Sequence, residues 1–283
     1  RNITDTPSEV CKSDSQQQNM SESRCNNADL PVLHGDEARR VDLDVTDKIG
    51  RIRILESVAT RIADTIHYHL GLIPPSSSSD DTAPLLFVAG KGNNGANAIA
   101  CARILHMRAV FGQKIRLVTL VDDEDGSILR PNMSEQLELF DALVGRDKRM
   151  AINKGGEALI REWKGVIVEG VLGTGISDPP RGLSLTAITA CNVASAEGGA
   201  RILAIDLPSG LNHVTGEAPG ECIRATWTLN LHMLKEGQLE ETAVPYVGEL
   251  WSAETALGFN TFGDDLTPKF VAFYKDGPIQ RVW

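Results

Sequence analysis

The chain has 283 residues, 42% of them hydrophobic, which is enough for one large α/β domain or for one domain with a tail. Its 38 acidic and 28 basic residues give a formal net charge of -10 at pH 7, which disfavours a surface that binds nucleic acid non-specifically. The cysteines are widely spaced and form no CxxC pair, so neither a disulfide framework nor a zinc module is predicted.

The sequence contains no membrane or secretion signal that we can identify. No stretch approaches the roughly 18 consecutive apolar residues of a membrane span, and no basic segment followed by an apolar one opens the chain. We expect a cytoplasmic protein with no membrane partner and with reduced thiols. Because the chain begins with Arg1 rather than Met, a piece of a longer protein is one interpretation.

The first part of the chain is polar and rich in Ser, Gln and Asn. Such a composition cannot bury enough apolar surface to offset the entropy that is lost on ordering. We predict a disordered linker over residues 1–30 and a folded domain over residues 31–283.

A helix is predicted next, between Ile52 and Leu70, because apolar residues recur there every three or four positions. The apolar positions of this helix, which should pack on the sheet, are Leu55, Val58, Ile62 and Ile66. Residues 74–81, rich in Pro and Ser, predict a loop before the first strand.

A strand, a glycine-rich turn and a helix then follow one another directly. The apolar run Leu85 to Ala89 leads through Gly90 to Gly95 into the helical stretch Ala96 to Met107. The first N–H groups of such a helix lack intrahelical partners and point at the turn, where they can bind an anion. The amides of Asn93 and Asn94 add donors and acceptors. We expect a nucleotide-like ligand; the alternative is a tight turn that only connects the strand to the helix.

Over the rest of the chain, short runs rich in β-branched residues are separated by helical stretches. Repeated strand and helix units predict an α/β fold, with a parallel sheet and helices on both of its faces. The predicted strands are Leu85–Ala89, Ile115–Val121, Val166–Val168, Arg201–Ile205 and Ala225–Leu231, and the predicted helices include Met133–Val144 and Leu185–Ala196. Ligands of such folds bind beyond the carboxyl ends of the strands, so we expect polar residues at these ends to share one pocket.

Asp206 is the expected catalytic residue, because it follows directly on a buried strand and precedes the turn at Pro208 to Gly210. Burial at a strand end raises the pKa of a carboxyl group and suits it to proton transfer. The alternative is a structural Asx-turn that holds this corner. Ser209 has no evident His partner and no nucleophile-elbow motif, which disfavours a hydrolase.

Oxygen ligands for a cation are also present at these strand ends. Glu169 ends the third predicted strand, and together with Asn94 and Ser209 it would offer the hard oxygen atoms that bind Mg²⁺, Ca²⁺ or an alkali cation. A single carboxylate favours a monovalent ion. A helix cap or an ion pair is the alternative role for Glu169.

Two further residues near these turns each have two possible roles. His213 either contacts a ligand or is simply solvated. Lys235 either reaches the pocket or is a surface cation, as most lysines are.

Three segments of the chain resemble the motifs of the NAD(P)H-hydrate epimerase family, also called the YjeF N-terminal domain. That family carries an A/G-x-G-N-N-G-G-D-G turn, an I-V-D-A-L-x-G-T-G strand end and an A-I-D-I-P-S-G strand end. Here they read as Ala89 to Ala98, Ile167 to Gly175 and Ala204 to Gly210. The resemblance covers roughly residues 35 to 260.

The resemblance implies a Rossmann-like three-layer sandwich with a central, mostly parallel sheet, which epimerises hydrated NADH or NADPH (NADHX, NADPHX) in metabolite repair. It also implies a homodimer and a bound potassium ion. Matched residue by residue, the implied potassium ligands are Asn94, Glu169 and Ser209, and Asp206 is the implied acid or base. The implied substrate-binding residues are Asn93, Asn94, Gly95, Ala96, Asn97, Gly173, Thr174, Gly175, Ile176, Ser177, Asp178, Pro179 and Asp206.

Two departures from the family pattern touch the expected pocket. The Gly-Gly-Asp-Gly of the family reads Gly95-Ala96-Asn97-Ala98 here, which replaces a carboxylate with an amide and adds methyl groups. Val-Asp-Ala reads Val168-Glu169-Gly170, which keeps the charge on a longer side chain.

These departures point to a second resemblance, to the C-terminal domain of the mRNA-decapping enhancer family. It implies a dimerising scaffold without catalysis, with RNA or decapping factors as partners. The altered turn after Gly95 looks like that family's turn, and Leu257 to Asn260 with Lys269 to Val271 resembles its C-terminal strand. The motifs at Asn93, Gly173 and Asp206 are intact, which argues against this second resemblance because a scaffold has no need of them.

Overall fold

The computed structural model describes residues 29–35, 37, 40–41, 48–72, 82–109, 114–122, 129–174, 178–255 and 266–283. The predicted loop at 74–81 and three predicted substrate residues, Gly175, Ile176 and Ser177, lie outside this part of the chain. So does the predicted linker, apart from residues 29 and 30, of which Leu30 is buried.

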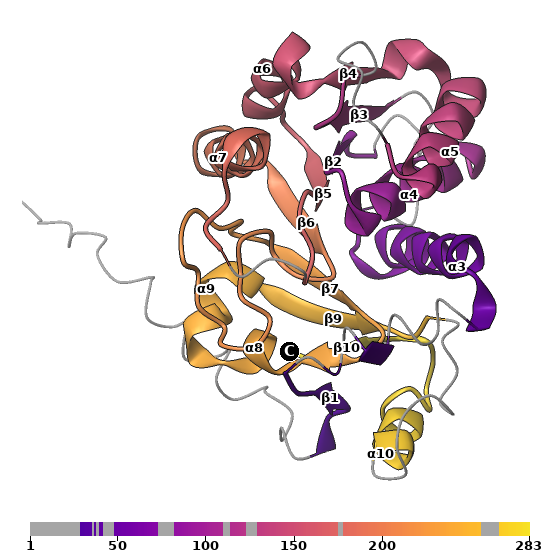
Figure 1. Cartoon of the computed structure of the whole chain (residues 1–283), viewed down its shortest axis with the longest axis vertical. Coiled ribbons are helices and arrows are strands. Elements are labelled where there is room, and N and C mark those ends of the chain that lie inside the picture. Colours follow the sequence, from indigo (N-terminus) through magenta and orange to yellow (C-terminus); the bar gives the residue numbers. More distant parts are fainter. Residues whose placement is uncertain are drawn as a thin grey trace, which may run out of the picture.

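A sheet of eight strands forms the middle of the molecule (Figure 1). Its strands, in sheet order, are β10 (Ile279–Arg281), β9 (Glu249–Ala253), β7 (Trp227–Leu231), β6 (Arg201–Ile205), β5 (Val166–Gly170), β2 (Leu85–Ala89), β3 (Ile115–Thr119) and β4 (Arg149–Ala151). All neighbours pair in parallel except β10 and β9, which are antiparallel. The expected mostly parallel sheet is confirmed.

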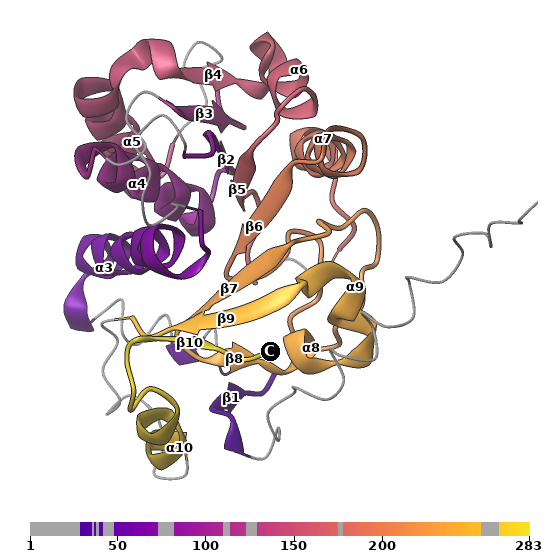
Figure 2. The same ribbon diagram turned by 180° about the vertical axis from the view of Figure 1, so that it is seen from behind.

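Helices cover both faces of this sheet, so the three-layer sandwich is confirmed as well (Figure 1, Figure 2). One face carries α3 (Arg51–Asp64), α4 (Asn93–Met107) and α5 (Pro131–Phe140); the other carries α6 (Gly156–Arg161) and α7 (Gly182–Gly198). Shorter helices lie nearer the β10 edge of the sheet: α8 (Glu236–Leu239), α9 (Val244–Val247) and α10 (Leu266–Phe273). Single turns complete the set: η2 (Thr65–His69), η5 (Asp141–Gly145), η6 (Arg146–Lys148), η7 (Ile152–Lys154) and η8 (Glu241–Ala243).

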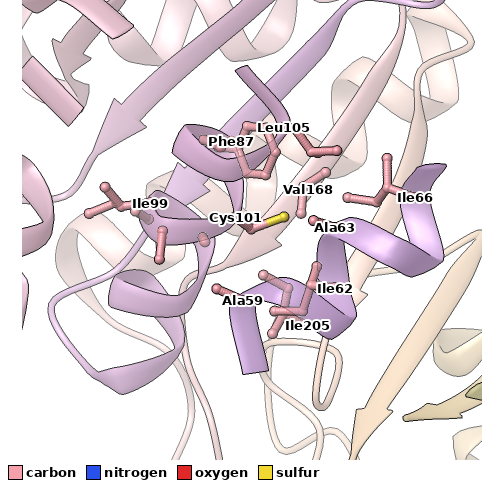
Figure 3. Packing of buried hydrophobic residues seen from close by; sticks show 14 of the residues in the cluster. Ala59, Ile62, Ala63, Ile66, Phe87, Ile99, Cys101, Leu105, Val168 and Ile205 are labelled. Atoms are coloured by element: carbon pink, nitrogen blue, oxygen red, sulfur yellow. The ribbon is translucent and has the colours of Figure 1, made fainter. Parts of the chain in front are cut away.

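The central strands β2 and β5 are buried on both faces, which is why they read as nearly continuous apolar runs. Alternate residues of β2 face opposite layers: Phe87 packs with α3 and α4, and Leu86 packs with the α7 layer. Figure 3 shows Phe87 next to Leu105 and close to Cys101 of α4, and Ile62 of α3 belongs to the same cluster. The predicted apolar stripe is buried throughout, at Leu55, Val58 and Ile62 of α3 and at Ile66 of η2, which continues α3.

A second sheet of two strands lies in the lower part of Figure 2, where β1 (Val32–Leu33) pairs in parallel with β8 (Leu234–Lys235). Leu30 and Val32 pack there against Leu207, Leu211 and the C-terminal residues. The segment that contains β1 thus packs against the chain that follows β7 and stabilises it.

Sequence patterns missed the outermost strands. Each of β4, β9 and β10 has only three to five residues and lacks an apolar run rich in β-branched residues. These strands form because a partner strand supplies their hydrogen bonds, and a local pattern does not reveal such a partner.

One expectation for the C-terminal part is wrong. Lys269 to Val271, compared above with a C-terminal strand, lies in helix α10. Phe270 is buried and contacts Tyr274, four residues later, with ring centroids 4.8 Å apart, which is a helical spacing. The last strand is β10 instead. Leu257 to Asn260 lie outside the described residues.

Candidate functional site

The carboxyl ends of β2, β5 and β6 lie side by side on one edge of the sheet, because these strands are parallel neighbours. The turns that follow them are in direct contact. Asn94 Nδ2 donates to the carbonyl of Leu172 after β5 and to that of Ile205 at the end of β6, both at 2.8 Å. One edge of the sheet therefore brings together the three motifs that the sequence singled out.

Glycines allow the backbones of these turns to touch. A Cβ at Gly90 would lie 1.9 Å from the carbonyl oxygen of Val171, and one at Gly95 would lie 2.0 Å from that of Gly90. Gly92 is different, since a Cβ there would meet nothing within 4 Å. Gly90 and Gly95 thus make room for the protein's own backbone, and Gly92 is the glycine with open space beside it.

Helix α4 begins in this turn, with Gly92 as its N-cap and no side-chain cap. Asn93 is the first helical residue, and its Oδ1 accepts from Arg51 Nη1 at 3.2 Å and from Asn132 Nδ2 at 3.4 Å. The uncapped first turn, next to a guanidinium, is an environment that suits an anion.

Asn94 is buried, and its amide nitrogen donates both of its protons to the carbonyls of Leu172 and Ile205. These two bonds fix the orientation of the amide. Its Oδ1 accepts no hydrogen bond from the described residues, so it remains available as an acceptor or a cation ligand.

Glu169 is completely buried in β5 and joins the turn after β5 to the turn after β6. One carboxylate oxygen accepts from Ser209 N at 3.0 Å, and the other accepts from Ser209 Oγ at 2.6 Å and Val171 N at 3.1 Å. Burial raises the pKa of Glu169 to about 7, although the hydrogen bonds from Ser209 and Val171 act in the opposite direction.

A cation fits the surroundings of Glu169. No cationic side chain in the described part of the chain pairs with this carboxylate, and its partners are neutral donors. The same part contains no cluster of three or more His, Cys, Asp or Glu residues suited to a metal. A cation here would therefore take one carboxylate and neutral oxygens from Asn94 and Ser209, a set that suits a monovalent ion.

Asp206 lies just beyond β6 and forms an ion pair with Lys235. Only 15% of its side chain is exposed, and Lys235 is buried, with 7% of its side chain exposed. Asp206 Oδ1 also accepts from Leu231 N at 3.2 Å. The described partners of this carboxylate thus belong to the last residue of β7 and to the segment after it, whereas the Asx-turn alternative would have it bond to its own turn.

The backbone of Asp206 adopts a left-handed conformation, with φ at 67°, which is uncommon for a residue other than glycine. Its N–H donates to Leu229 O at 2.8 Å, and its carbonyl accepts from Gln238 Nε2 at 2.7 Å. Gln238 is buried in α8, so strand β7 and helix α8 together hold this conformation.

The remaining predicted substrate residues line the same edge or its surroundings. A Cβ at Gly173 would lie 3.8 Å from Asn94 Nδ2, so the segment of Gly173 and Thr174 passes beside Asn94. Ala96 is buried and Asn97 half-buried in the first turns of α4. Asp178 and Pro179 are exposed, and Pro179 lies close to Gly220.

The structure shows the surroundings of Lys235 and His213, the two residues for which the sequence left two alternative roles. Lys235 is buried against Asp206, so it is not a surface cation. His213 lies beside α8, where its carbonyl accepts from Gly237 N at 2.9 Å. The pKa of Glu236 in α8 is lowered mainly by a hydrogen bond from Gly35 and by His34, with His213 contributing.

Sequence reasoning missed Asn230 and Gln238, both of which contact the Asp206 and Lys235 pair. A signal for Asn230 was present, since an amide side chain follows Leu229 near the carboxyl end of the mostly apolar strand β7. Gln238 had no comparable signal, because a glutamine in a short helix is ordinarily exposed.

No helix in the described part of the chain is both long and apolar enough to cross a membrane.

Comparisons with known proteins agree with this geometry. A family model described as "YjeF-related protein N-terminus" matches residues 51–237. The bifunctional NAD(P)H-hydrate repair enzyme Nnr of Moorella thermoacetica is 28% identical over 213 residues, which cover 74% of this chain and 37% of that protein. The NAD(P)H-hydrate epimerase of Limosilactobacillus fermentum is 27% identical over 198 residues, which cover 70% of this chain and 82% of that protein.

The crystal structure of yeast ynu0, YNL200c, is similar with a TM-score of 0.66 and 15% identity, covering 88% of this chain and 99% of the yeast chain. This similarity concerns the fold.

The chain spans about a third of the length of the bifunctional relatives and most of the length of the epimerase relatives. These relatives confirm the first resemblance and offer no support for the second, to the mRNA-decapping enhancer family. Since the family model matches about two-thirds of the chain, the chain belongs to the family of the YjeF-related protein N-terminus.

Proposed function

We propose that this protein is an isomerase that interconverts the R and S epimers of NADHX or NADPHX. The observation that carries the proposal is the meeting of three turns at one sheet edge, where Asn94 in the uncapped first turn of α4 bonds to Ile205, the residue before Asp206. Relatives named NAD(P)H-hydrate epimerase and NAD(P)H-hydrate repair enzyme support the same reaction.

The proposed chemistry needs one transferable proton at the hydrated ring. The bond from the ring carbon to its hydroxyl breaks while the ring nitrogen forms a double bond to that carbon. A proton from the Asp206 and Lys235 pair turns the departing hydroxyl into water. Water then adds to the opposite face of the carbon, the nitrogen recovers its electron pair, and the carboxylate of Asp206 takes the proton back.

The phosphates of the substrate would lie at the start of α4, where the N–H groups of Asn93 to Gly95 lack a side-chain cap. Arg51, which donates to Asn93 Oδ1, adds positive charge at this place. Thr174 and Asn97 are further proposed contacts of the substrate.

The test uses one purified NADHX epimer and follows the appearance of the other by chromatography. The wild-type protein should interconvert the epimers well above the spontaneous rate. Asp206→Asn should reduce the rate to the spontaneous one while nucleotide binding is largely kept, because Asn tolerates the left-handed backbone and fills the same volume. Asp147→Asn, at an exposed aspartate before β4, is the matched control and should keep the wild-type rate.

A wild-type rate equal to the spontaneous rate would instead favour the scaffold function of the second resemblance. Pull-down of RNA or decapping factors from the same preparation would measure that alternative.

A potassium ion is the proposed bound cation, held by Asn94, Glu169 and Ser209. It would compensate the buried charge of Glu169, which the neutral donors around it do not balance. Potassium should then raise the free energy of unfolding, by about 1.4 kcal/mol for each tenfold excess over its dissociation constant.

Thermal unfolding in KCl and in tetramethylammonium chloride at equal ionic strength measures this stabilisation. Glu169→Gln should abolish the difference between the two salts. Equal midpoints for the wild-type protein in both salts would contradict a potassium site.

A homodimer and a cytoplasmic location remain predictions from the resemblance and the composition. Light scattering on the purified protein measures the first, and microscopy of a tagged full-length protein in cells measures the second.

A further inference from the structure

A row of buried polar side chains connects the Asp206 and Lys235 pair to the segment after α10. Asn230 of β7 and Ser252 of β9 have no exposed surface, and their side chains are 2.7 Å apart, from Asn230 Nδ2 to Ser252 Oγ. Ser252 Oγ lies 2.7 Å from the hydroxyl of Tyr274. At the other end of the row, Lys235 Nζ donates to Asn230 Oδ1 at 2.8 Å.

The direction of each hydrogen bond in this row can be assigned. Tyr274 donates its only proton to the carbonyl of His232 at 2.8 Å, so the hydroxyl of Ser252 must donate to Tyr274. Burial raises the pKa of Tyr274, so this hydroxyl keeps its proton. Ser252 in turn accepts from the amide nitrogen of Asn230, which leaves the amide oxygen of Asn230 facing Lys235.

All the donors therefore point the same way, from Lys235 through Asn230, Ser252 and Tyr274 to His232. Hydrogen bonds in such a chain polarise and strengthen one another. A rotated Asn230 amide would direct N–H groups at an ammonium and at the same time lose the bond to Ser252. The row thus selects one orientation of Asn230.

Lys235 has no donor to spare. Its ammonium group has three protons, and three acceptors surround it: Asp206 Oδ1, Asn230 Oδ1 and the carbonyl of Leu231 at 3.1 Å. Direct donation to a ligand would break one of these bonds. Lys235 therefore acts through Asp206.

We propose that Asn230, Ser252 and Tyr274 are positioning residues that hold the Lys235 ammonium against Asp206. Their catalytic effect rests on the proposed function, in which the Asp206 and Lys235 pair handles the proton. Buried polar groups in the middle of a sheet are costly unless they are fully bonded, and this row is bonded throughout.

The experiment compares the wild-type protein with Asn230→Leu, which removes the acceptor of Lys235 at similar volume, and with Tyr274→Phe, which removes only the last hydroxyl. Thr228→Val is the matched control. Thr228 lies on the same face of β7 as Asn230, is equally buried, and donates one hydrogen bond to Val247 O at 2.7 Å, away from Lys235.

The first readout does not depend on activity. Native protein is treated with formaldehyde and a borane reductant, and methylation of Lys235 is compared with that of the exposed Lys91 by peptide mass mapping. Lys235 should be protected in the wild type and in Thr228→Val. It should be methylated at least several-fold faster in Asn230→Leu, and to a smaller extent in Tyr274→Phe.

The second readout is the epimerase assay. Asn230→Leu should lower kcat about tenfold, as expected for a lost hydrogen bond to a charged group, while KM changes less than twofold. Tyr274→Phe should lower kcat about threefold, and Thr228→Val should leave it unchanged. A general loss of packing would instead affect Thr228→Val as strongly as Asn230→Leu.

Protection of Lys235 that is the same in the wild type, Asn230→Leu and Tyr274→Phe would overturn the positioning proposal, whatever the rates. If Asn230→Leu does not fold, Tyr274→Phe alone decides the question, because it keeps the aromatic ring. Loss of protection in a protein without epimerase activity would support the positioning role and overturn the proposed function, so the two failures are distinguishable.

Discussion

At the scale of single residues, two residues at or near the candidate site have a left-handed backbone conformation. Asp206 has φ at 67° and His232 has φ at 75°. Each lies just beyond a strand, where the chain must turn sharply, and each is held by hydrogen bonds to neighbouring segments. Side chains in this region are strained unless their surroundings fix them, so the packing around β7 is part of the site.

His232 provides a prediction about pH. Burial lowers its pKa to about 3, and Lys235 contributes to this shift. The unfolded chain binds a proton near pH 6.5, whereas the folded protein does so only near pH 3, so stability is lost as pH falls between these values. Protonation of this histidine in the unfolded chain alone should lower the free energy of unfolding by roughly 3 kcal/mol between pH 7 and pH 4.

Urea unfolding at pH 7, 5.5 and 4 measures this loss. His232→Asn suits the left-handed backbone. Between pH 7 and pH 4 the free energy of unfolding of this variant should fall by about 3 kcal/mol less than that of the wild type. An identical pH dependence for both proteins would contradict the prediction.

At the scale of elements, the glycine-rich turn between β2 and α4 is held by contact with the segment after β5. The sequence suggested that this turn binds an anion. The structure shows that Gly90 and Gly95 first make room for backbone atoms of the protein itself. The turn is therefore a packing junction between two βα units as well as a candidate anion site.

Gly95→Ala should destabilise the fold by about 3 kcal/mol, because the added methyl group would lie 2.0 Å from the carbonyl oxygen of Gly90. Gly92→Ala is the matched control in the same turn. Its added methyl group meets nothing within 4 Å, and its φ of -101° is ordinary, so the cost should stay below about 1 kcal/mol. Chemical denaturation of both variants checks the difference; equal costs would show that the contact with Gly90 does not limit the turn.

At the scale of the whole molecule, the segments outside the matched family region complete the fold. Residues after 237 supply β9 and β10, and residues before 51 supply β1, which pairs with β8 directly before α8. The C-terminal residues Val282 and Trp283 are buried in the same cluster as Leu30 and Leu207. Both flanks thus support the segment that carries Lys235.

Trp283 provides a test of this support. Its side chain is buried and its indole N–H donates to Gly248 O at 3.0 Å. Trp283→Ala should lower the free energy of unfolding by about 3 kcal/mol, and Trp283→Phe by about 1 kcal/mol, because the ring still fills most of the space. Equal and negligible effects in urea unfolding would show that the C-terminal residues are not part of the cooperative fold.

The sequence by itself determined the elements in the middle of the sheet and the turns that follow them. Leu85–Ala89 and Arg201–Ile205 were predicted with the bounds that the structure shows, and the apolar stripe of α3 was read correctly. These features depend on local periodicity and on turn chemistry, which neighbouring residues encode. The three motifs could be assigned to one edge because parallel strands end together.

Only the tertiary structure decided which residues surround Asp206. Lys235 lies 29 positions further along the chain, Tyr274 is 42 positions from His232, and the outer strands β4, β9 and β10 carry no strong pattern of their own. The physical reason is that these features are pairings between distant segments. Their partners are chosen by the packing of the whole sheet, which local periodicity does not contain.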